Sequence, residues 1–514
     1  MKIKLLIACF SISLAIQSQI SPTEIDQLVT NSLTAFNVPG IAVSVIKDGK
    51  VIHSKGYGVT SIVTNQKVDE NTLFGIASNS KAFTAAALAI LIDEGKLNWD
   101  DKVISYLPDF KMYNDYVTNE FTIRDLLTHR SGLGLGAGDL MIWPDGNNFT
   151  SKDIIHNLRF LKPVSNFRTQ FDYDNLLYIV AGEVIAKVSG NSWSEFIESR
   201  ITSPLSMNRT AGSFKRLKDT TNIATPHVPI QEKLKPISRY KNPILDAAGG
   251  IYSSVNDLNK WLLTLLNKGK NPENNNQLFS PELLNDMWSL QTIIPKTTIP
   301  PYNTHFGGYG LGWFLSDVKG YKEVTHTGGL EGMVTQVTMI PELNLGIIVL
   351  TNQQSGSAFT AITNTIKNSY LNIPKIDLVA IYSRSEKNVI SGTDKVNEEV
   401  WKNIEKNKND KNIKNKFEQL QGMYSDNWFG DITLTFKKNK LYFQSLRSKQ
   451  LAGEVFYYKE NIYAVKWNNA FFHADAFIFV SLDENGKPQN LKMKAISPLT
   501  DFSYDFHDLD FNRK

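Results

Sequence analysis

The sequence predicts an α+β or α/β fold: an antiparallel sheet made from both chain ends with an inserted helical region, followed by an antiparallel β-barrel-like domain. Three observations predict it. Alternating strand patterns over residues 40–58 return over residues 309–352. The stretch from 78 to 290 is mainly helical in pattern, and short aromatic and β-branched segments recur from Phe417 onward.

The length and charge of the chain limit the class of protein and the number of domains. The chain has 514 residues, of which 42% are hydrophobic and 21% charged, which is ordinary globular composition with length for two or more domains. The formal net charge of +4 is spread along the chain, without a basic stripe interleaved with aromatic residues. Nucleic acid is therefore not an expected partner.

Residues 1–18 have the pattern of a secretory signal peptide, although a frayed N-terminal helix is the alternative. Lys2 and Lys4 precede an apolar run from Leu5 to Ile16, which is too short to span a membrane. No later apolar run approaches the length of a membrane span, so we expect no integral membrane span. The signal-peptide pattern predicts an exported protein, periplasmic or extracellular. Cys9, the sole cysteine, lies in this segment, which excludes disulfides and cysteine chemistry from the mature protein.

Residues 19–372 are expected to form the first domain. Alternation on both sides of Asp48-Gly49 predicts a β-hairpin with an Asp-Gly turn. Residues 373–415 are rich in Lys, Asn and Glu and predict a solvated, charged helical linker. Residues 416–514 contain six strand-like segments, which are DITLTF, KLYFQSL, EVFYYKE, IYAVKW, AFIFVSL and NLKMKAI.

Lys81 stands at the start of an apolar run whose residues cover nearly the whole circumference of a helix, so its charge would be buried. Ser78 shares a helical face with Lys81, whereas the adjacent Ser80 points away. A desolvated lysine has a lowered pKa and can accept a proton from serine. The alternative is that Ser78 only caps the helix and Lys81 reaches water. The spacing alone is weak, since Ser238 to Lys241 repeats it without an apolar helix.

Two further motifs follow in order. Tyr173-Asp174-Asn175 precedes a helix with one apolar face, and a tyrosine beside a lysine can relay a proton. The alternative for this motif is structural: Tyr173 would only pack against its neighbours, and Asn175 would only cap the helix. His326-Thr327-Gly328-Gly329 follows a strand that begins near Val324, and its glycines would let a ligand approach the backbone. Its alternative is a hydrogen-bonded histidine at a strand bulge.

Residues 130–140 are rich in glycine, which is a feature of nucleotide-binding loops. Gly132, Gly134 and Ala137 fit the spacing of such a loop on paper. The stretch follows a helical segment, whereas a dinucleotide fingerprint needs a strand first. We predict an ordinary loop.

The ordered combination of Ser-x-x-Lys, Tyr-x-Asn and His-Thr-Gly resembles the serine hydrolases related to class C β-lactamases and penicillin-binding DD-peptidases, and thus a β-lactamase-like fold. The resemblance runs from about Pro39 to Asn352 and includes LFGIASNSKAFTA, FTIRDLLTHRSGL, FDYDNLLYIVAG, AAGGIYSSVNDLNKWL, YGLGWF and HTGGLEGM. The tail from about Glu418 resembles, less closely, a lipocalin-like β-domain attached to some of these enzymes.

The resemblance implies a role for each motif residue. Ser78 would become acylated, and Lys81 and Tyr173 would manage the proton; which of them is the base stays open. The implied substrate-binding residues are Asn175, His326, Thr327 and Gly328. The backbone N–H groups of Ser78 and Gly329 would form the oxyanion hole. No metal or other cofactor is implied.

One position departs from the class C β-lactamase pattern, because His326 stands where those enzymes carry lysine. A neutral histidine would hold a substrate carboxylate weakly. We therefore expect a DD-peptidase or D-aminopeptidase-like enzyme acting on a small-molecule or peptide substrate, such as cell-wall fragments or β-lactams. A β-lactamase or esterase is the alternative. A penicillin- or peptide-binding protein without turnover, or a β-domain that binds an apolar ligand or serves only in packing, stays open, as does the oligomeric state.

Overall fold

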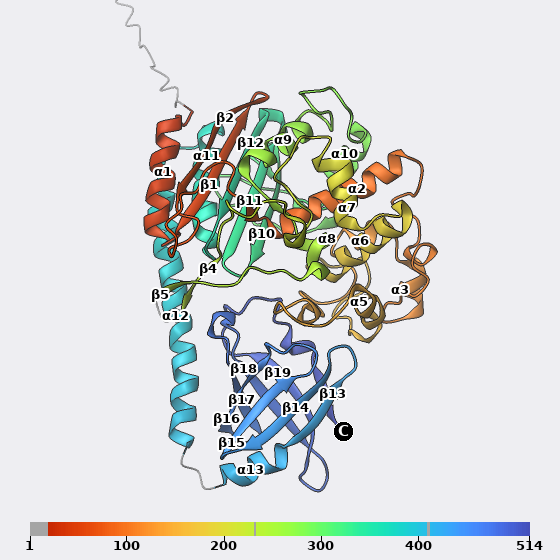
Figure 1. Cartoon of the computed structure of the whole chain (residues 1–514), viewed down its shortest axis with the longest axis vertical. Coiled ribbons are helices and arrows are strands. Elements are labelled where there is room, and N and C mark those ends of the chain that lie inside the picture. Colours follow the sequence, from red (N-terminus) through yellow and green to blue (C-terminus); the bar gives the residue numbers. More distant parts are fainter. Residues whose placement is uncertain (1–18, 231–232, 409–411) are drawn as a thin grey trace, which may run out of the picture.

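The computed structural model describes residues 19–230, 233–408 and 412–514, so the predicted signal peptide and Cys9 lie outside the described residues. A sheet with helices on both faces forms one part of the molecule, and a β-barrel forms the other (Figure 1). The helix α12 (Leu378–Asn407) runs beside both parts.

The central sheet contains eight strands in the order β2-β1-β12-β11-β10-β9-β8-β7, and its paired strands are antiparallel. This confirms the prediction that both ends of the region supply one sheet. The strands are β1 (Gly40–Lys47), β2 (Lys50–Gly58), β7 (Thr292–Ile293), β8 (Gly307–Tyr309), β9 (Phe314–Val318), β10 (Tyr321–Leu330), β11 (Met333–Ile340) and β12 (Leu345–Thr351). The predicted hairpin is confirmed too. Asp48 and Gly49 have φ angles of 52° and 74°, the left-handed pair that a tight hairpin turn needs.

The sheet separates two hydrophobic cores because alternate side chains point to opposite faces. Ile41, Val43 and Val45 face a core completed by α1 (Pro22–Ala35) and α11 (Gly356–Tyr370). Side chains of the opposite face, such as Ala42, join the core under the inserted helices.

The inserted region supplies the helices on that second face (Figure 1). They are α2 (Ser80–Asp93), α3 (Asp115–Glu120), α4 (Ile123–Leu126), α5 (Ser151–Asn157), α6 (Leu176–Ser189), α7 (Trp193–Ile197), α8 (Asp246–Gly249), α9 (Val255–Leu266) and α10 (Pro281–Met287). Two short ladders also occur here, β3 (Phe74–Gly75) with β6 (Tyr252–Ser253), and β4 (His227–Ile230) with β5 (Lys233–Pro236). Helix α2 is buried from Ser80 to Leu91, as its all-round apolar sequence predicts.

The second part is a closed barrel of eight antiparallel strands, which confirms the predicted barrel-like domain. The strands are β13 (Gly422–Asp426), β14 (Gly430–Lys437), β15 (Lys440–Ser445), β16 (Ala452–Lys459), β17 (Ile462–Trp467), β18 (Ala476–Leu482), β19 (Pro488–Ala495) and β20 (Asp510–Arg513). The six predicted segments form β14 to β19, whereas β13 and β20, which pair to close the barrel, were not predicted. A helix, α13 (Ile413–Leu420), precedes β13. Aromatic rings fill the barrel, as in the contact of Phe443 with Trp467 at 5.3 Å between ring centroids.

The barrel packs against the inserted helices through polar contacts as well as the shared core. The Asn157 side chain at the end of α5 donates to the Trp428 carbonyl at 2.8 Å. Arg447 binds Asp153 of α5 at 3.1 Å. Among the helices of the described residues, none combines the length and the apolar composition that a bilayer crossing requires.

Candidate active site

Ser78 lies in a single turn of 3-10 helix (Ala77–Asn79), immediately before α2. The sequence predicted that Ser78 shares a helical face with Lys81 at the start of the helix; the α-helix itself begins at Ser80, with Lys81 in its first turn. Ala77 has a φ angle of 49°, a left-handed conformation that costs energy for a residue with a Cβ and reorients the chain before Ser78. The Ser80 hydroxyl faces away and accepts a hydrogen bond from the Ile251 N–H at 3.1 Å.

Lys81 is fully buried and its ammonium group lies among three oxygen atoms. Nζ is 3.1 Å from Ser78 Oγ, 2.7 Å from Asn175 Oδ1 and 2.9 Å from the Ala248 carbonyl oxygen. Burial lowers the pKa of Lys81 to about 7, although the carboxyl groups of Asp139 and Asp174 oppose that shift. The predicted contact of Ser78 with Lys81 is therefore present, and Lys81 does not reach water.

The three oxygen partners of Lys81 satisfy the three N–H donors of an ammonium, and they are also compatible with a neutral amine. A neutral amine has two N–H donors and one lone pair, and two of its three partners, Asn175 Oδ1 and the Ala248 carbonyl, can only accept. The lone pair then faces the Ser78 hydroxyl, which can donate to it. The arrangement can therefore remove the proton of Ser78.

Tyr173 lies in the loop before α6, with its ring packed on His129 at 4.2 Å between centroids. The Lys81 ammonium lies 4.8 Å from the centre of the Tyr173 ring. Burial raises the pKa of Tyr173 well above its ordinary value, while a hydrogen bond with Ser78 opposes the rise. Tyr173 is thus a phenol at neutral pH. His129, which the sequence did not single out, holds this loop by accepting a hydrogen bond from the Asp174 N–H at 3.0 Å.

Asn175 occupies the N-cap position of α6 but its side chain does not cap the helix. Its Oδ1 faces Lys81, and its Nδ2 donates to Asp139 Oδ2 at 2.8 Å. Burial raises the pKa of Asp139 well above its ordinary value. Asp139 lies near the end of the glycine-rich stretch, which forms a loop as predicted up to the 3-10 turn at Asp139–Met141, and no local pattern marked it as a site residue.

Strand β10 carries the His-Thr-Gly-Gly motif along an open edge. The partner β9 pairs with β10 only as far as Thr325, so the edge from His326 to Leu330 lies next to the Ser78 turn instead. The sequence placed the motif after a strand, but β10 continues to Leu330.

His326 is buried, and its surroundings define a neutral ring. Its Nδ1 lies 2.6 Å from the Thr327 carbonyl, which can only accept, so Nε2 accepts from the Tyr309 hydroxyl at 2.9 Å. Burial lowers the pKa of His326 to about 3, and Lys81 adds to the shift. A neutral ring cannot pair with a substrate carboxylate as a lysine would.

The two glycines of β10 differ in their surroundings. A Cβ on Gly328 would lie 2.2 Å from the Ile76 carbonyl oxygen, so only glycine lets this strand approach the Ser78 turn. A Cβ on Gly329 would meet nothing within 4 Å. Gly329 therefore borders open space beside Ser78.

That space is a cavity of about 530 Å³, lined by both parts of the molecule. From the motifs it is lined by Ser78, Tyr173, Asn175, His326, Thr327, Gly328 and Gly329. The structure thus brings the predicted residues together, with Lys81 directly behind Ser78.

The far side of the cavity comes from a barrel loop that the sequence did not connect with the site. The Phe502 ring lies 5.8 Å from that of Tyr173. The Ser503 hydroxyl donates to Asp139 Oδ2 at 2.9 Å, and Asp505 Oδ2 accepts from the Gly138 N–H at 2.6 Å.

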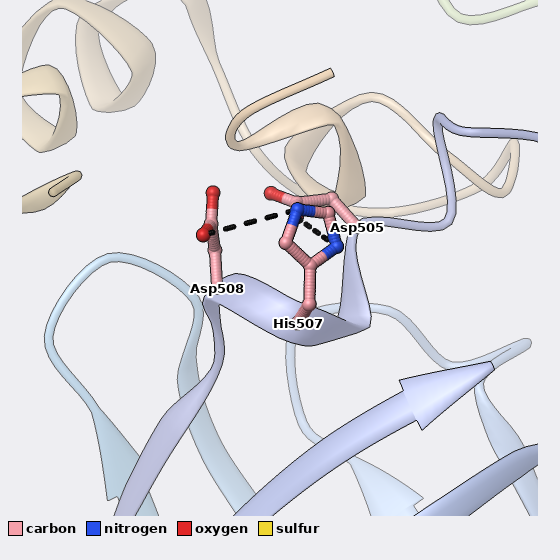
Figure 2. Close-up of side chains that lie close together, drawn as sticks. All are labelled: Asp505, His507 and Asp508. Carbon is pink, nitrogen blue, oxygen red and sulfur yellow. Dashed lines mark ion pairs between the residues drawn. The ribbon is translucent and has the colours of Figure 1, made fainter. Parts of the chain in front are cut away.

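Asp505, His507 and Asp508 are a group whose ligand atoms lie close enough together to share a metal ion (Figure 2). His507 Nδ1 is 3.2 Å from Asp505 Oδ1, and its Nε2 is 4.0 Å from Asp508 Oδ1. The two carboxyl groups face different ring nitrogens. Asp505 Oδ1 and Asp508 Oδ2 have no hydrogen-bond partner among the described residues, and nothing else in the geometry marks this group as a metal site.

Comparisons with known proteins agree with the geometry. Residues 25–370 match the family model described as Beta-lactamase, and residues 406–513 match a domain of unknown function, DUF3471. Unguisins hydrolase ungD of Aspergillus violaceofuscus is 30% identical over 382 residues, 69% of this chain and 65% of that protein. Protein flp of Staphylococcus aureus strain N315 is 28% identical over 339 residues, 65% of this chain and 64% of its own.

These relatives match over less than two thirds of their own length. A solved structure, the octameric penicillin-binding protein homologue from Pyrococcus abyssi, superposes with a TM-score of 0.61 over 96% of this chain and 100% of that chain, at 24% identity. At that identity the likeness concerns the fold.

Proposed function

The chain belongs to the Beta-lactamase family of serine hydrolases, and from this premise we propose that Ser78 is acylated by a peptide, amide or ester. The observation that supports this most is the buried Lys81 amine, whose pKa is lowered to about 7, at 3.1 Å from the Ser78 hydroxyl. Turnover is favoured over simple binding because a binding protein needs no such proton acceptor.

In the first half-reaction, Lys81 takes the Ser78 proton while Oγ forms a bond to the substrate carbonyl carbon. The bond from that carbon to the leaving amine or alcohol then breaks, and the leaving group receives the proton. In the second half-reaction, water attacks the ester carbon, the bond from that carbon to Ser78 Oγ breaks and releases the acid, and Oγ takes the proton that the water gives up. Lys81 is the better first base, since burial keeps Tyr173 protonated and suits it to relay the proton.

Two further groups would hold the reacting carbonyl and its neighbour. The backbone N–H groups of Ser78 and Gly329 border the open space where a carbonyl oxygen would sit, and one such donor is worth about 3 kcal/mol in the transition state. Asn175 Nδ2 has two hydrogens and gives one to Asp139, so the other is available to a substrate amide oxygen.

The proposed substrates are D-amino-acid peptides and amides, including cell-wall fragments. A neutral His326 disfavours substrates held by a carboxylate, so efficient cephalosporin turnover would contradict this assignment. An esterase or β-lactamase is the alternative. Export is also part of the proposal, and an N-terminus that begins close after residue 18 in secreted protein would support it.

The test is the mass of the intact protein after incubation with a penicillin, with Ser78→Ala alongside. An adduct that Ser78→Ala lacks would identify the nucleophile. Without an adduct, the penicillin that remains separates two cases. Consumed drug would mean a β-lactamase, and untouched drug would direct the search to D-aminoacyl amides and short esters. Absence of any hydrolysis or adduct with all three classes would refute the proposal.

A further inference from the structure

Two carboxyl groups line the cavity, one from each part of the molecule. Glu331 follows β10 in the turn that leads to β11, and Asp501 lies in the barrel loop beside Phe502. Because side chains alternate along a strand, Thr327 and Gly329 lie on the same side of β10. Glu331 is the first residue of the two-residue turn that joins Leu330 to Met333.

Neither carboxyl group has a cationic partner among the residues that the structure describes. No ion pair within 4.0 Å involves either of them, and no lysine or arginine is among the described residues that line the cavity. Asp501 Oδ1 accepts from the Ser503 N–H at 2.9 Å, and the Ser503 side chain also hydrogen-bonds with Asp501. Burial raises the pKa of Glu331 to about 8, with the carboxyl groups of Asp501 and Asp145 adding to the rise. Glu331 and Asp501 therefore face each other's charge without a cationic side chain to offset it, among the described residues.

A third polar group that lines the cavity, the Tyr504 hydroxyl, lacks a hydrogen-bond partner among the described residues. Tyr504 is only 6% exposed. The charges of Glu331 and Asp501 both raise its pKa further above the value that burial sets. The Phe472 ring packs 5.5 Å from the Tyr504 ring. Carboxyl groups, a phenol oxygen and aromatic faces are the groups that bind an organic ammonium ion, and the cation itself would favour the ionised form of Glu331.

We propose that Glu331, Asp501 and Tyr504 form a subsite for the cationic amine of the acyl donor. This inference rests on the proposed function and narrows it to substrates with a free amine near the scissile carbonyl, as in an aminopeptidase. A DD-carboxypeptidase substrate would instead need a cation for its terminal carboxylate, and none lines the cavity in the described residues.

The experiment compares D-alanine p-nitroanilide with its N-acetyl derivative, which differs in lacking the charge. We expect wild-type kcat/KM to favour the free amine by tenfold or more, and Glu331→Gln and Asp501→Asn each to reduce kcat/KM for the amine by about tenfold. The acetylated substrate should change less than twofold. Glu484→Gln, an exposed carboxyl in the turn after β18, is the matched control. Equal effects on both substrates would overturn the subsite.

Two readouts separate this inference from the proposed function. Hydrolysis of p-nitrophenyl acetate should persist in all these variants, and its absence in the wild type, without any acylation of Ser78, would refute the hydrolase itself. Calorimetry with Ser78→Ala protein measures binding without turnover. D-alaninamide should bind at least tenfold tighter than N-acetyl-D-alaninamide, and lose that advantage in Glu331→Gln. Equal binding, or binding of the amine that EDTA abolishes, would overturn the proposal.

Discussion

The cavity has two walls that are built differently. The hydrolase wall carries Ser78, Tyr173 and Asn175, with Lys81 behind them, and the barrel wall is the loop with residues 499–504. On the hydrolase wall, Lys81 is 0% exposed and Asn175 is held from two sides, so the reacting groups have fixed positions. On the barrel wall, Leu499 is 50% exposed and Phe502 is 38% exposed. The difference teaches that the proposed reacting groups are fixed by burial, whereas the barrel adds exposed side chains to the same cavity. The first wall is locked by burial and hydrogen bonds, whereas the second presents side chains that can be exchanged.

The largest expected effect comes from removing the proposed base, Lys81, from the hydrolase wall. Lys81→Met should lower kcat for any substrate by about 10³-fold, because Ser78 loses its proton acceptor. The release of p-nitrophenol from p-nitrophenyl acetate, followed with wild type and variant, would measure this loss in kcat. Ser80→Ala is the neighbouring control and should keep most activity, with a loss of about 1–2 kcal/mol in unfolding free energy since the Ile251 N–H loses its partner. A Lys81→Met enzyme of near wild-type activity would remove the basis for the assignment.

The same wall predicts a pH dependence. Only neutral Lys81 can accept the proton, and its pKa is lowered to about 7, so kcat/KM should rise about tenfold per unit up to that pH and then level off. Asp174→Asn removes a carboxyl group that raises this pKa and should move the limb to lower pH. The profile is measured with an uncharged ester so that only the enzyme titrates. A flat profile from pH 5 to 8 would contradict a lysine base.

A substitution on the barrel wall should act on selectivity alone. Phe502→Ala removes apolar surface beside Tyr173, so kcat/KM for a phenylacetyl ester should fall about tenfold while that for an acetyl ester stays within about twofold. Phe479→Ala, a similarly exposed ring on β18, is the control and should change neither. Equal losses on both esters would mean that Phe502 supports the catalytic groups instead.

The smallest effect concerns the contact between the walls. Ser503→Ala deletes the hydrogen bond to Asp139 and should lower the free energy of unfolding by about 1 kcal/mol, with kcat changed only a few-fold. Urea unfolding of this variant beside Ser481→Ala, at an exposed position of β18, measures the difference. A loss of activity as large as that of Lys81→Met would mean that the barrel contact is itself required for catalysis.

The two walls also differ in how far the sequence could predict them. The hydrophobic pattern and the spacing of Ser78 and Lys81 are local, and they suffice to place the lysine in a buried helix beside the serine. Bringing Tyr173 and His326 to the same place depended on resemblance, since nothing local joins three distant segments. Asp139 and Ser503 lie 364 residues apart and meet only because the barrel packs on the loop before α5.

The missed strands have a related cause. β13 (Gly422–Asp426) and β20 (Asp510–Arg513) are short and carry charged or small residues, so neither shows a sustained alternation. They are strands because closing the barrel supplies partners on both edges. Register with a distant partner, rather than propensity, determines them.

The helix α12 gives this arrangement a mechanical consequence. It is about 45 Å long, at 1.5 Å per residue. Near its start, Ser383 donates to the Ala35 carbonyl of α1 at 3.0 Å, and near its end the Trp401 ring meets Phe456 of the barrel at 5.4 Å. The barrel is thus connected to the rest of the molecule through α12 and also through its direct contacts with α5. We expect heat to melt both parts in one cooperative calorimetric transition, so that selectivity and chemistry are lost at the same temperature.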